Sequence, residues 1–302
     1  MLDLHGAFTA IVTPFTRDGS RIDFARLEEQ IRFQAEGGIT GIVACGTTGE
    51  SPTLSEAEHR GVVEKAVEIG KPMGLIVIAG AGSNNTAHAM HLQKIAKDAG
   101  ADGALQVNPY YNKPSQEGLY RHFMAVADAV DLPIMLYNIP GRTGVALSPD
   151  TVARLAQHEN IIAIKEATGS LDSASEIIQK CGDNLQLLSG DDTMTLPFAS
   201  VGGIGVVSVV SNILPRETIA LCAAFNRGDW EEAKRMHYEL FGLSKALLSL
   251  ETNPIPIKTA MKILGHDSGA LRLPMCEPTE AIVKKIEALV KECEVMKCEV
   301  IK

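Results

Sequence analysis

A lysine that ends an apolar run has the clearest capacity for chemistry in this sequence. Lys165 directly follows four apolar residues. If the run is a strand, alternation places Ile161, Ala163 and Lys165 on one face, and Ile162 and Ile164 share the other. A strand that is apolar throughout is typically covered on both faces, so Lys165 would be semi-buried. Burial lowers the pKa of a lysine, and the neutral amine can attack a carbonyl group to form a Schiff base.

Polar residues also end four other apolar runs. These segments are residues 46–50, 108–112, 137–142 and 189–192. In a barrel of parallel strands, the carboxyl ends of all strands meet at one mouth. The polar side chains of these segments would therefore converge with Lys165.

Four of these side chains suit roles around a reactive lysine. Tyr137 could act as an acid or base, and its alternative is a core tyrosine whose hydroxyl bonds a backbone carbonyl. Arg142 offers a fork for a carboxylate, and its alternative is a solvated loop arginine. Thr47 and Thr48 lie between glycines, where amides and hydroxyls can bind an oxyanion. Helix capping is the alternative for the two threonines.

The neighbouring charges allow other interpretations. Lys165 could instead form a salt bridge with Glu166 or with a neighbouring strand. Asp191 and Asp192 could hold a divalent cation, but one adjacent pair without a partnering His or Glu favours solvated loop carboxylates. We therefore expect no metal site.

Short apolar runs alternate with amphipathic segments along the chain. Strands are expected at residues 8–13, 39–44, 75–79, 104–107, 134–137, 161–165, 185–188 and 205–209. Helices are expected at residues 24–35, 86–96 and 116–130, with another beginning near Ser55, which forms a capping-box pattern with Glu58. Eight alternating units predict a parallel sheet closed into a (β/α)8 TIM barrel. An open doubly wound sheet is the competitor, but no G-x-G-x-x-G follows the first strand.

About 90 residues follow the eighth expected strand, which is more than a barrel needs. Helices are expected there at residues 231–250, 257–264 and 279–293. We therefore predict a barrel domain over residues 1–225 and a C-terminal helical extension over residues 226–302.

Composition narrows the class of protein. The formal net charge of −9 and the pI of about 5.4 give no electrostatic basis for binding nucleic acid or an anionic membrane. No apolar run approaches a membrane span, and no basic region followed by an apolar stretch indicates a signal peptide. Cysteines stand at positions 45, 181, 222, 276, 293 and 298, without a C-x-x-C pair. Reduced thiols and a cytoplasmic location are the expectation.

Taken together, the motifs resemble those of the dihydrodipicolinate synthase family. They are GTTGE at 46–50, PYYNKPSQEG at 109–118, YNIPGRT at 137–143, IKEATG at 164–169, LSGDD at 188–192 and NPIPIK at 253–258. The resemblance extends from about residue 6 to residue 278. It implies a barrel with a C-terminal helical domain, which agrees with the elements expected above.

The resemblance also implies residue roles. Lys165 would form an imine with pyruvate, Tyr137 would assist as acid or base, and Thr48 and Tyr111 would complete a proton relay. In the family the tyrosine at the position of Tyr111 reaches into the site from the adjacent subunit of a tight dimer. Arg142 would bind the carboxylate of aspartate semialdehyde. The amides and hydroxyls of Thr47 and Thr48 would hold the pyruvate carboxylate, and Gly190 and Val207 would line the pocket.

The implied activity is that of 4-hydroxy-tetrahydrodipicolinate synthase in lysine (diaminopimelate) biosynthesis, with pyruvate and L-aspartate 4-semialdehyde as substrates. No metal or organic cofactor is implied, and the implied assembly is a homotetramer, a dimer of dimers. The same fold and lysine serve lyases of sialic acids and keto-deoxy sugar acids. Arg142 after Pro-Gly and the segment Tyr110-Tyr111 favour the synthase over them. A non-catalytic metabolite-binding barrel is the alternative from another class.

Feedback-inhibited members of the family bind lysine at the tight-dimer interface. The matching positions here are Ser51, Pro52, Glu56, His59, Asn84, His88 and Tyr110. Members with this effector site usually carry a glutamate where this chain has His88, and often a histidine where it has Glu56. A carboxylate there pairs with the amine of the ligand, and a neutral imidazole cannot supply that charge. We therefore expect weak or absent inhibition by lysine.

Overall fold

The protein is a closed barrel of eight parallel strands in chain order. The computed structural model describes residues 2–300, and the side chains of residues 2–292. Each strand pairs with the next, and β8 pairs with β1 to close the barrel. The strands are β1 (Gly6–Ala10), β2 (Gly41–Ala44), β3 (Ile76–Gly80), β4 (Gly103–Val107), β5 (Ile134–Asn138), β6 (Ile161–Glu166), β7 (Gln186–Ser189) and β8 (Gly205–Ser208). The expected (β/α)8 TIM barrel is confirmed.

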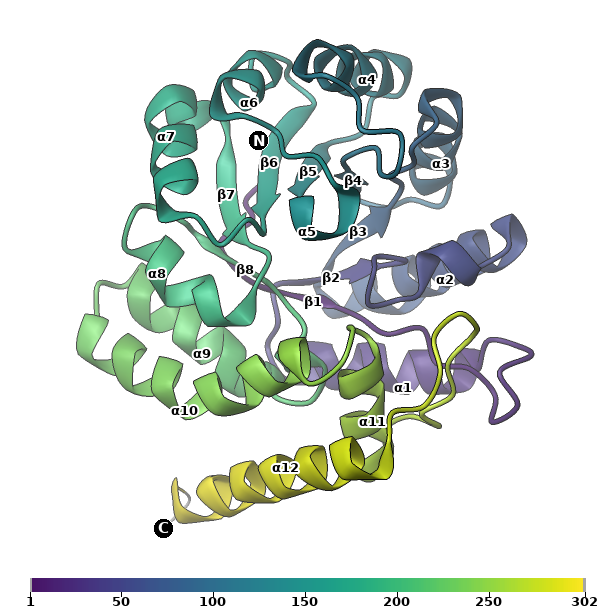
Figure 1. Ribbon diagram of the computed structural model, residues 1–302, viewed down its shortest axis with the longest axis vertical. Coiled ribbons are helices and arrows are strands. Elements are labelled where there is room, and N and C mark those ends of the chain that lie inside the picture. Colours follow the sequence, from purple (N-terminus) through teal and green to yellow (C-terminus); the bar gives the residue numbers. More distant parts are fainter. Residues whose placement is uncertain (1, 301–302) are drawn as a thin grey trace.

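Helices surround the barrel on the outside (Figure 1). They are α1 (Phe24–Glu36), α2 (Glu56–Gly70), α3 (Thr86–Asp98), α4 (Gln116–Ala129), α6 (Pro149–Leu155), α7 (Leu171–Cys181), α8 (Thr195–Ala199) and α9 (Pro215–Asn226). The short helix α5 (Pro140–Thr143) lies within this ring in Figure 1. The expected capping box begins α2: Ser55 accepts a hydrogen bond from the Glu58 amide, and the Glu58 carboxylate accepts one from the Ser55 amide. This reciprocal bonding satisfies two of the amides that a helix N-terminus leaves unpaired.

Three helices follow the barrel, as expected: α10 (Trp230–Ser249), α11 (Ile255–Ile263) and α12 (Glu280–Val300). Their apolar faces join the outer surface of β8 and α9 in one buried cluster, which includes Val206, Leu221, Leu240, Ile257 and Ile286. In Figure 1, α10 lies beside α9, and α12 forms the lower edge of the molecule. The C-terminal helices are therefore packed on one side of the barrel by apolar burial.

The expected faces of β6 are wrong at its first two residues. Ile134 pairs with Ile161, but Met135 pairs with Ala163, so β6 carries an extra residue opposite β5. As a result Ile161 packs in the outer cluster, whereas Ile162 joins the barrel interior. A bulge of this kind breaks the alternation on which the sequence argument depended. Beyond the bulge, Ala163 lies in the barrel interior and Ile164 in the outer cluster, as expected.

The first strand is shorter and earlier than expected. The β1 ladder ends at Ala10, although the amide of Ile11 still donates to the carbonyl of Val43. Thr13 already belongs to the loop after the strand, where its hydroxyl donates to the carbonyl of Gly49.

Two further expectations concern thiols and membranes. Cys45, Cys181, Cys222 and Cys276 are free thiols, whereas the side chains of Cys293 and Cys298 lie outside the described residues. Within the described part of the chain, no helix combines the length and the hydropathy of a membrane span.

The seam between β1 and β8 gives a test of barrel closure. In Gly205→Ala the new Cβ would lie 2.0 Å from the carbonyl oxygen of Gly6, so one of the two strands must shift. We expect the free energy of unfolding to fall by about 1–3 kcal/mol, as for other overpacked sites. Gly242→Ala on α10 is the control, because that site has open space and a helical alanine gains about 0.5–1 kcal/mol over glycine. Urea unfolding measures both, and equal stability of the two variants would contradict the prediction.

Candidate active site

Lys165 lies at the carboxyl end of β6, inside the mouth of the barrel. It pairs in register with Tyr137 of β5 and Leu188 of β7. Its side chain is only 6% exposed, and its Nζ lies 4.3 Å from the centre of the Tyr137 ring. The strand-end argument from the sequence therefore brought the lysine and the tyrosine together correctly.

Glu166 does not form the alternative salt bridge with Lys165. One of its carboxylate oxygens accepts a hydrogen bond from Asn138 Nδ2 at 3.0 Å, and the other accepts one from the amide of Thr168 at 2.7 Å. Burial raises the pKa of Glu166, and these hydrogen bonds oppose the shift. The carboxylate next to the lysine in sequence is thus engaged elsewhere.

The surroundings of Lys165 favour its neutral form. Burial lowers its pKa to about 8; the negative charge of Asp192 opposes the shift and the positive charge of Arg142 adds to it. An amine with a pKa of about 8 has an appreciable neutral fraction near pH 7, and the neutral form is the nucleophile.

Tyr137 is buried beside the lysine but keeps a polar partner. Burial raises the pKa of its phenol to about 12, while the charge of Arg142 and a hydrogen bond with Thr47 act in the opposite direction. The phenol therefore remains protonated at neutral pH and can donate or pass on a proton. The polar group that acts on the phenol is the Thr47 side chain, whereas the alternative for a core tyrosine was a bond to a backbone carbonyl.

The two threonines of residues 46–50 have different partners. Thr47 lines the same cavity as Tyr137, and its side chain acts to lower the pKa of that phenol. The Thr48 hydroxyl is buried and accepts a hydrogen bond from Asn253 Nδ2 at 3.0 Å. The hydroxyl that adjoins the tyrosine is therefore that of Thr47, whereas the resemblance placed Thr48 in the relay.

Asn253 is a site residue that the sequence analysis did not identify. Besides contacting Thr48, it accepts a hydrogen bond at its backbone carbonyl from Arg142 Nη2, at 3.1 Å. Arg142 stands on the short helix α5 and is itself exposed. Asn253 belongs to NPIPIK, one of the motifs that carried the resemblance, so the segment was noted but given no role.

Gly190 lies against the Lys165 side chain, and Val207 lies in the barrel interior. A Cβ at Gly190 would lie 3.0 Å from two carbons of the Lys165 side chain and 2.8 Å from the Cβ of Ala167. Because Gly190 has no side chain, the Lys165 side chain can occupy this space. Val207 is fully buried in β8 and shares the barrel-interior cluster with Tyr137.

The expectation of solvated carboxylates is wrong for Asp192. Its side chain is buried, and its Oδ2 accepts hydrogen bonds from the amides of Val209 and Val210 at 2.9 and 3.2 Å. Burial raises the pKa of Asp192, and these amides oppose the shift. Asp191 instead accepts hydrogen bonds from the amide and hydroxyl of Thr193. Among the described residues, no group of three or more His, Cys, Asp or Glu side chains could hold a metal ion.

Tyr111 stands apart from the other candidates. Its side chain is 90% exposed, and its backbone has a φ of 73°, in the left-handed region that a bulky residue rarely adopts. Tyr110 beside it is 40% exposed. Within one chain the structure therefore does not bring Tyr111 to Lys165.

One cavity of about 440 Å³ extends from the active site to most of the predicted effector residues. Thr47, Tyr137 and Arg142 line it together with Ser51, Pro52, Glu56, His59, His88 and Tyr110. Asn84 is absent from this lining, and its carbonyl accepts a hydrogen bond from Asn112.

The histidines near this cavity have their own partners. His59 is buried and contacts the carbonyl of Gly80 through Nε2 at 2.7 Å, and burial lowers its pKa. His88 lies 3.3 Å from the hydroxyl of Ser83. Glu56 pairs with His91 at 3.1 Å, a contact that the sequence did not indicate.

Comparison with known proteins assigns the family. The family model described as the dihydrodipicolinate synthetase family matches residues 3–293. The chain is 53% identical over 289 residues to 4-hydroxy-tetrahydrodipicolinate synthase of Citrifermentans bemidjiense, covering 95% of this chain and 98% of that protein. The solved structure of 4-hydroxy-tetrahydrodipicolinate synthase from Methylacidiphilum fumariolicum superposes with a TM-score of 0.95 at 45% identity, covering 99% of this chain and 98% of that one. Dihydrodipicolinate synthase from Aquifex aeolicus gives a TM-score of 0.93 at 46% identity, with 96% and 98% covered. The chain therefore belongs to the dihydrodipicolinate synthetase family.

Proposed function

We propose that this protein is a 4-hydroxy-tetrahydrodipicolinate synthase, which condenses pyruvate with L-aspartate 4-semialdehyde in lysine (diaminopimelate) biosynthesis. The observation that carries the proposal is Lys165, buried at the barrel mouth beside Tyr137 with a pKa lowered to about 8. The relatives that match almost the whole chain carry the same activity in their names.

The chemistry begins with attack of the Lys165 amine on the keto carbon of pyruvate. The carbinolamine loses water to give a protonated imine, which draws electrons from the methyl group. Loss of a methyl proton gives an enamine, whose carbon attacks the aldehyde of the second substrate. The amino group of that substrate then attacks the imine carbon, which closes the ring and releases Lys165. Every atom comes from the two substrates and the lysine, so we propose no cofactor and no metal.

Tyr137 and Thr47 are proposed to carry protons during imine formation and hydrolysis. The phenol stays protonated at neutral pH because its pKa is raised to about 12, and Thr47 lines the same cavity. The amides and hydroxyls of Thr47 and Thr48 are proposed to hold the pyruvate carboxylate. Gly190 and Val207 shape the space beside Lys165.

Arg142 is proposed to bind the carboxylate of aspartate semialdehyde. Its hydrogen bond to the Asn253 carbonyl fixes one end of the guanidinium, while the exposed position leaves other N–H groups for a ligand. This contact supports an aldehyde that carries a carboxylate near the mouth of the barrel.

A homotetramer built from tight dimers is proposed as the assembly. Tyr111 is exposed and held in a left-handed conformation, as expected of a side chain that is ordered by a partner subunit. In such a dimer it would join the relay of Tyr137 and Thr47 in the neighbouring site.

A cytoplasmic location is also proposed, because the buried thiols of Cys45, Cys181 and Cys222 are unpaired.

The activity can be tested with Lys165→Ala. Wild-type protein should consume aspartate semialdehyde in a pyruvate-dependent reaction. Borohydride should reduce its imine with pyruvate and so link pyruvate covalently to the protein. The variant should lose both, because no other buried amine lies beside Tyr137 in the described structure. A folded wild-type protein that traps pyruvate but ignores aspartate semialdehyde would move the assignment to a lyase of sialic or keto-deoxy sugar acids. Failure to trap pyruvate would favour a non-catalytic binding barrel.

The pH dependence of imine formation follows from the lowered pKa of Lys165. At subsaturating pyruvate the trapping rate should rise with pH and level off above about 8, where the amine is mostly neutral. Below that pH the neutral fraction falls about tenfold per unit. Rapid-quench borohydride trapping from pH 6 to 11 measures the profile. A midpoint near the ordinary lysine value of 10.5 would show that burial does not tune this amine.

Inhibition by lysine is proposed to be weak or absent. The cavity that would receive the effector has His88 beside Ser83, and Glu56 is already paired with His91. L-lysine at about 1 mM should leave the rate nearly unchanged. This concentration would half-saturate a site with a binding free energy of about −4 kcal/mol. His88→Glu restores a carboxylate and should increase the sensitivity. Strong inhibition of the wild type at sub-millimolar lysine would contradict the proposal.

A further inference from the structure

The loop that carries Thr47 and Thr48 ends in an acidic residue with an unusual backbone. Glu50 has a φ of 54°, in the left-handed region where glycine is favoured over other residues. Its amide donates to the carbonyl of Thr47 at 3.1 Å, so its position and that of Thr47 are coupled. A charged side chain at a position that favours glycine indicates that contacts of the carboxylate stabilise this backbone conformation.

The Glu50 carboxylate is held by residues that follow the barrel. Its side chain is 2% exposed, and it forms an ion pair with Lys258 of α11, which is fully buried, at 2.5 Å. Its second oxygen accepts a hydrogen bond from the backbone amide of Arg272 at 3.1 Å. Lys258 also donates to the carbonyl of Ala270 at 2.8 Å and lies 4.2 Å from the centre of the Phe15 ring. Thus both oxygens of Glu50 are bound by the C-terminal part of the chain.

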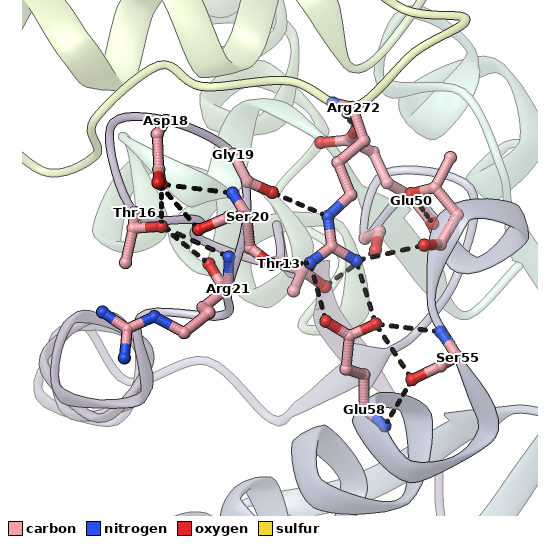
Figure 2. A network of polar contacts seen from close by, with 12 residues as sticks. Thr13, Thr16, Asp18, Gly19, Ser20, Arg21, Glu50, Ser55, Glu58 and Arg272 are labelled. Carbon is pink, nitrogen blue, oxygen red and sulfur yellow. Dashed lines mark hydrogen bonds and ion pairs between the residues drawn. The ribbon is translucent and has the colours of Figure 1, made fainter.

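The Arg272 side chain ties the same segment to two more loops. Its guanidinium forms two hydrogen bonds with the Glu58 carboxylate, at 2.9 and 2.6 Å, and donates to the carbonyls of Gly19, Ser20 and Thr53. Figure 2 shows Arg272 between the loop around Gly19 and the start of α2 at Ser55 and Glu58. Hydrogen bonding by Arg272 lowers the pKa of Glu58 to about 2, so this carboxylate is charged at neutral pH.

The loop of residues 46–50 is also held from its other side. The hydroxyl of Thr13, which follows β1, donates to the carbonyl of Gly49 at 2.7 Å. The loop is therefore held by β1 at Gly49 and by the C-terminal segment at Glu50, directly after the two threonines.

We propose that Glu50, Lys258 and Arg272 are positioning residues of the active site. They are not paired with Lys165 or Tyr137, but they hold residues 46–50 so that Thr47 faces the cavity that it lines together with Tyr137. In this interpretation the helices after the barrel support catalysis directly, through one buried ion pair. The inference rests on the proposed function, in which Thr47 carries protons and both Thr47 and Thr48 hold the pyruvate carboxylate.

Glu50→Gln is the first test, because it keeps the size of the side chain and removes its charge. The loosened loop should raise the KM for pyruvate at least about tenfold, since a displacement of about 1 Å in a reacting group can cost a hundredfold in rate. The rate of borohydride trapping at subsaturating pyruvate should fall in parallel, measured per folded molecule. Trapping by wild-type protein in the same assay reports on the proposed function separately.

The double variant Glu50→Gln/Lys258→Met covers the case in which an unpaired Lys258 unfolds the single variant. Removing one member of a buried ion pair is costly because it leaves an uncompensated buried charge, and the double variant leaves none. This variant should therefore have a wild-type urea midpoint but a raised KM for pyruvate. Leu243→Ala is the matched control, because it removes buried apolar surface from α10 and should lower stability while leaving that KM unchanged. A folded double variant whose KM for pyruvate equals that of the wild type would overturn the proposal.

Discussion

The removal of Lys165 from water is the constraint on which the rest of the site depends. The closed barrel surrounds the end of β6 with side chains of the neighbouring strands, so the amine is almost wholly buried and its charged form loses hydration. That loss is the main cause of its lowered pKa. The same enclosure keeps the phenol of Tyr137 protonated, and it requires a glycine at position 190 to make room for the lysine.

Packing of the C-terminal segment against the barrel also determines which distant residues become neighbours. Thr48 and Asn253 are about 200 positions apart in the chain, yet their side chains share a hydrogen bond. Arg142, from a third segment, donates to the carbonyl of the same asparagine. The site that would bind pyruvate and the site that would bind the second substrate are therefore connected through one residue. Each of these segments is short and stands on a rigid element, which favours a fixed geometry.

The helices after the barrel serve two physical purposes. Their apolar faces bury the outer side of β8 and α9, a contribution to stability that many hydrophobic sequences could make. The C-terminal segment also makes a more specific contact, because Lys258 of α11 and the backbone amide of Arg272, between α11 and α12, bind the carboxylate of Glu50. A buried ion pair is a weak source of stability but a strict constraint on geometry. This contrast explains why the segment combines an apolar face with a buried charge.

The sequence alone determined the barrel, the C-terminal helices, the place of Lys165 and its pairing with Tyr137, because strand period and strand ends are local properties. Only the tertiary structure decided the bulge that turns Ile162 inward, the choice of Thr47 as the partner of Tyr137, and the burial of Asp192. These features depend on the register between strands and on loops that meet across the barrel mouth. A local pattern can place a side chain at the end of a strand, but contacts between segments far apart in the chain select its partner.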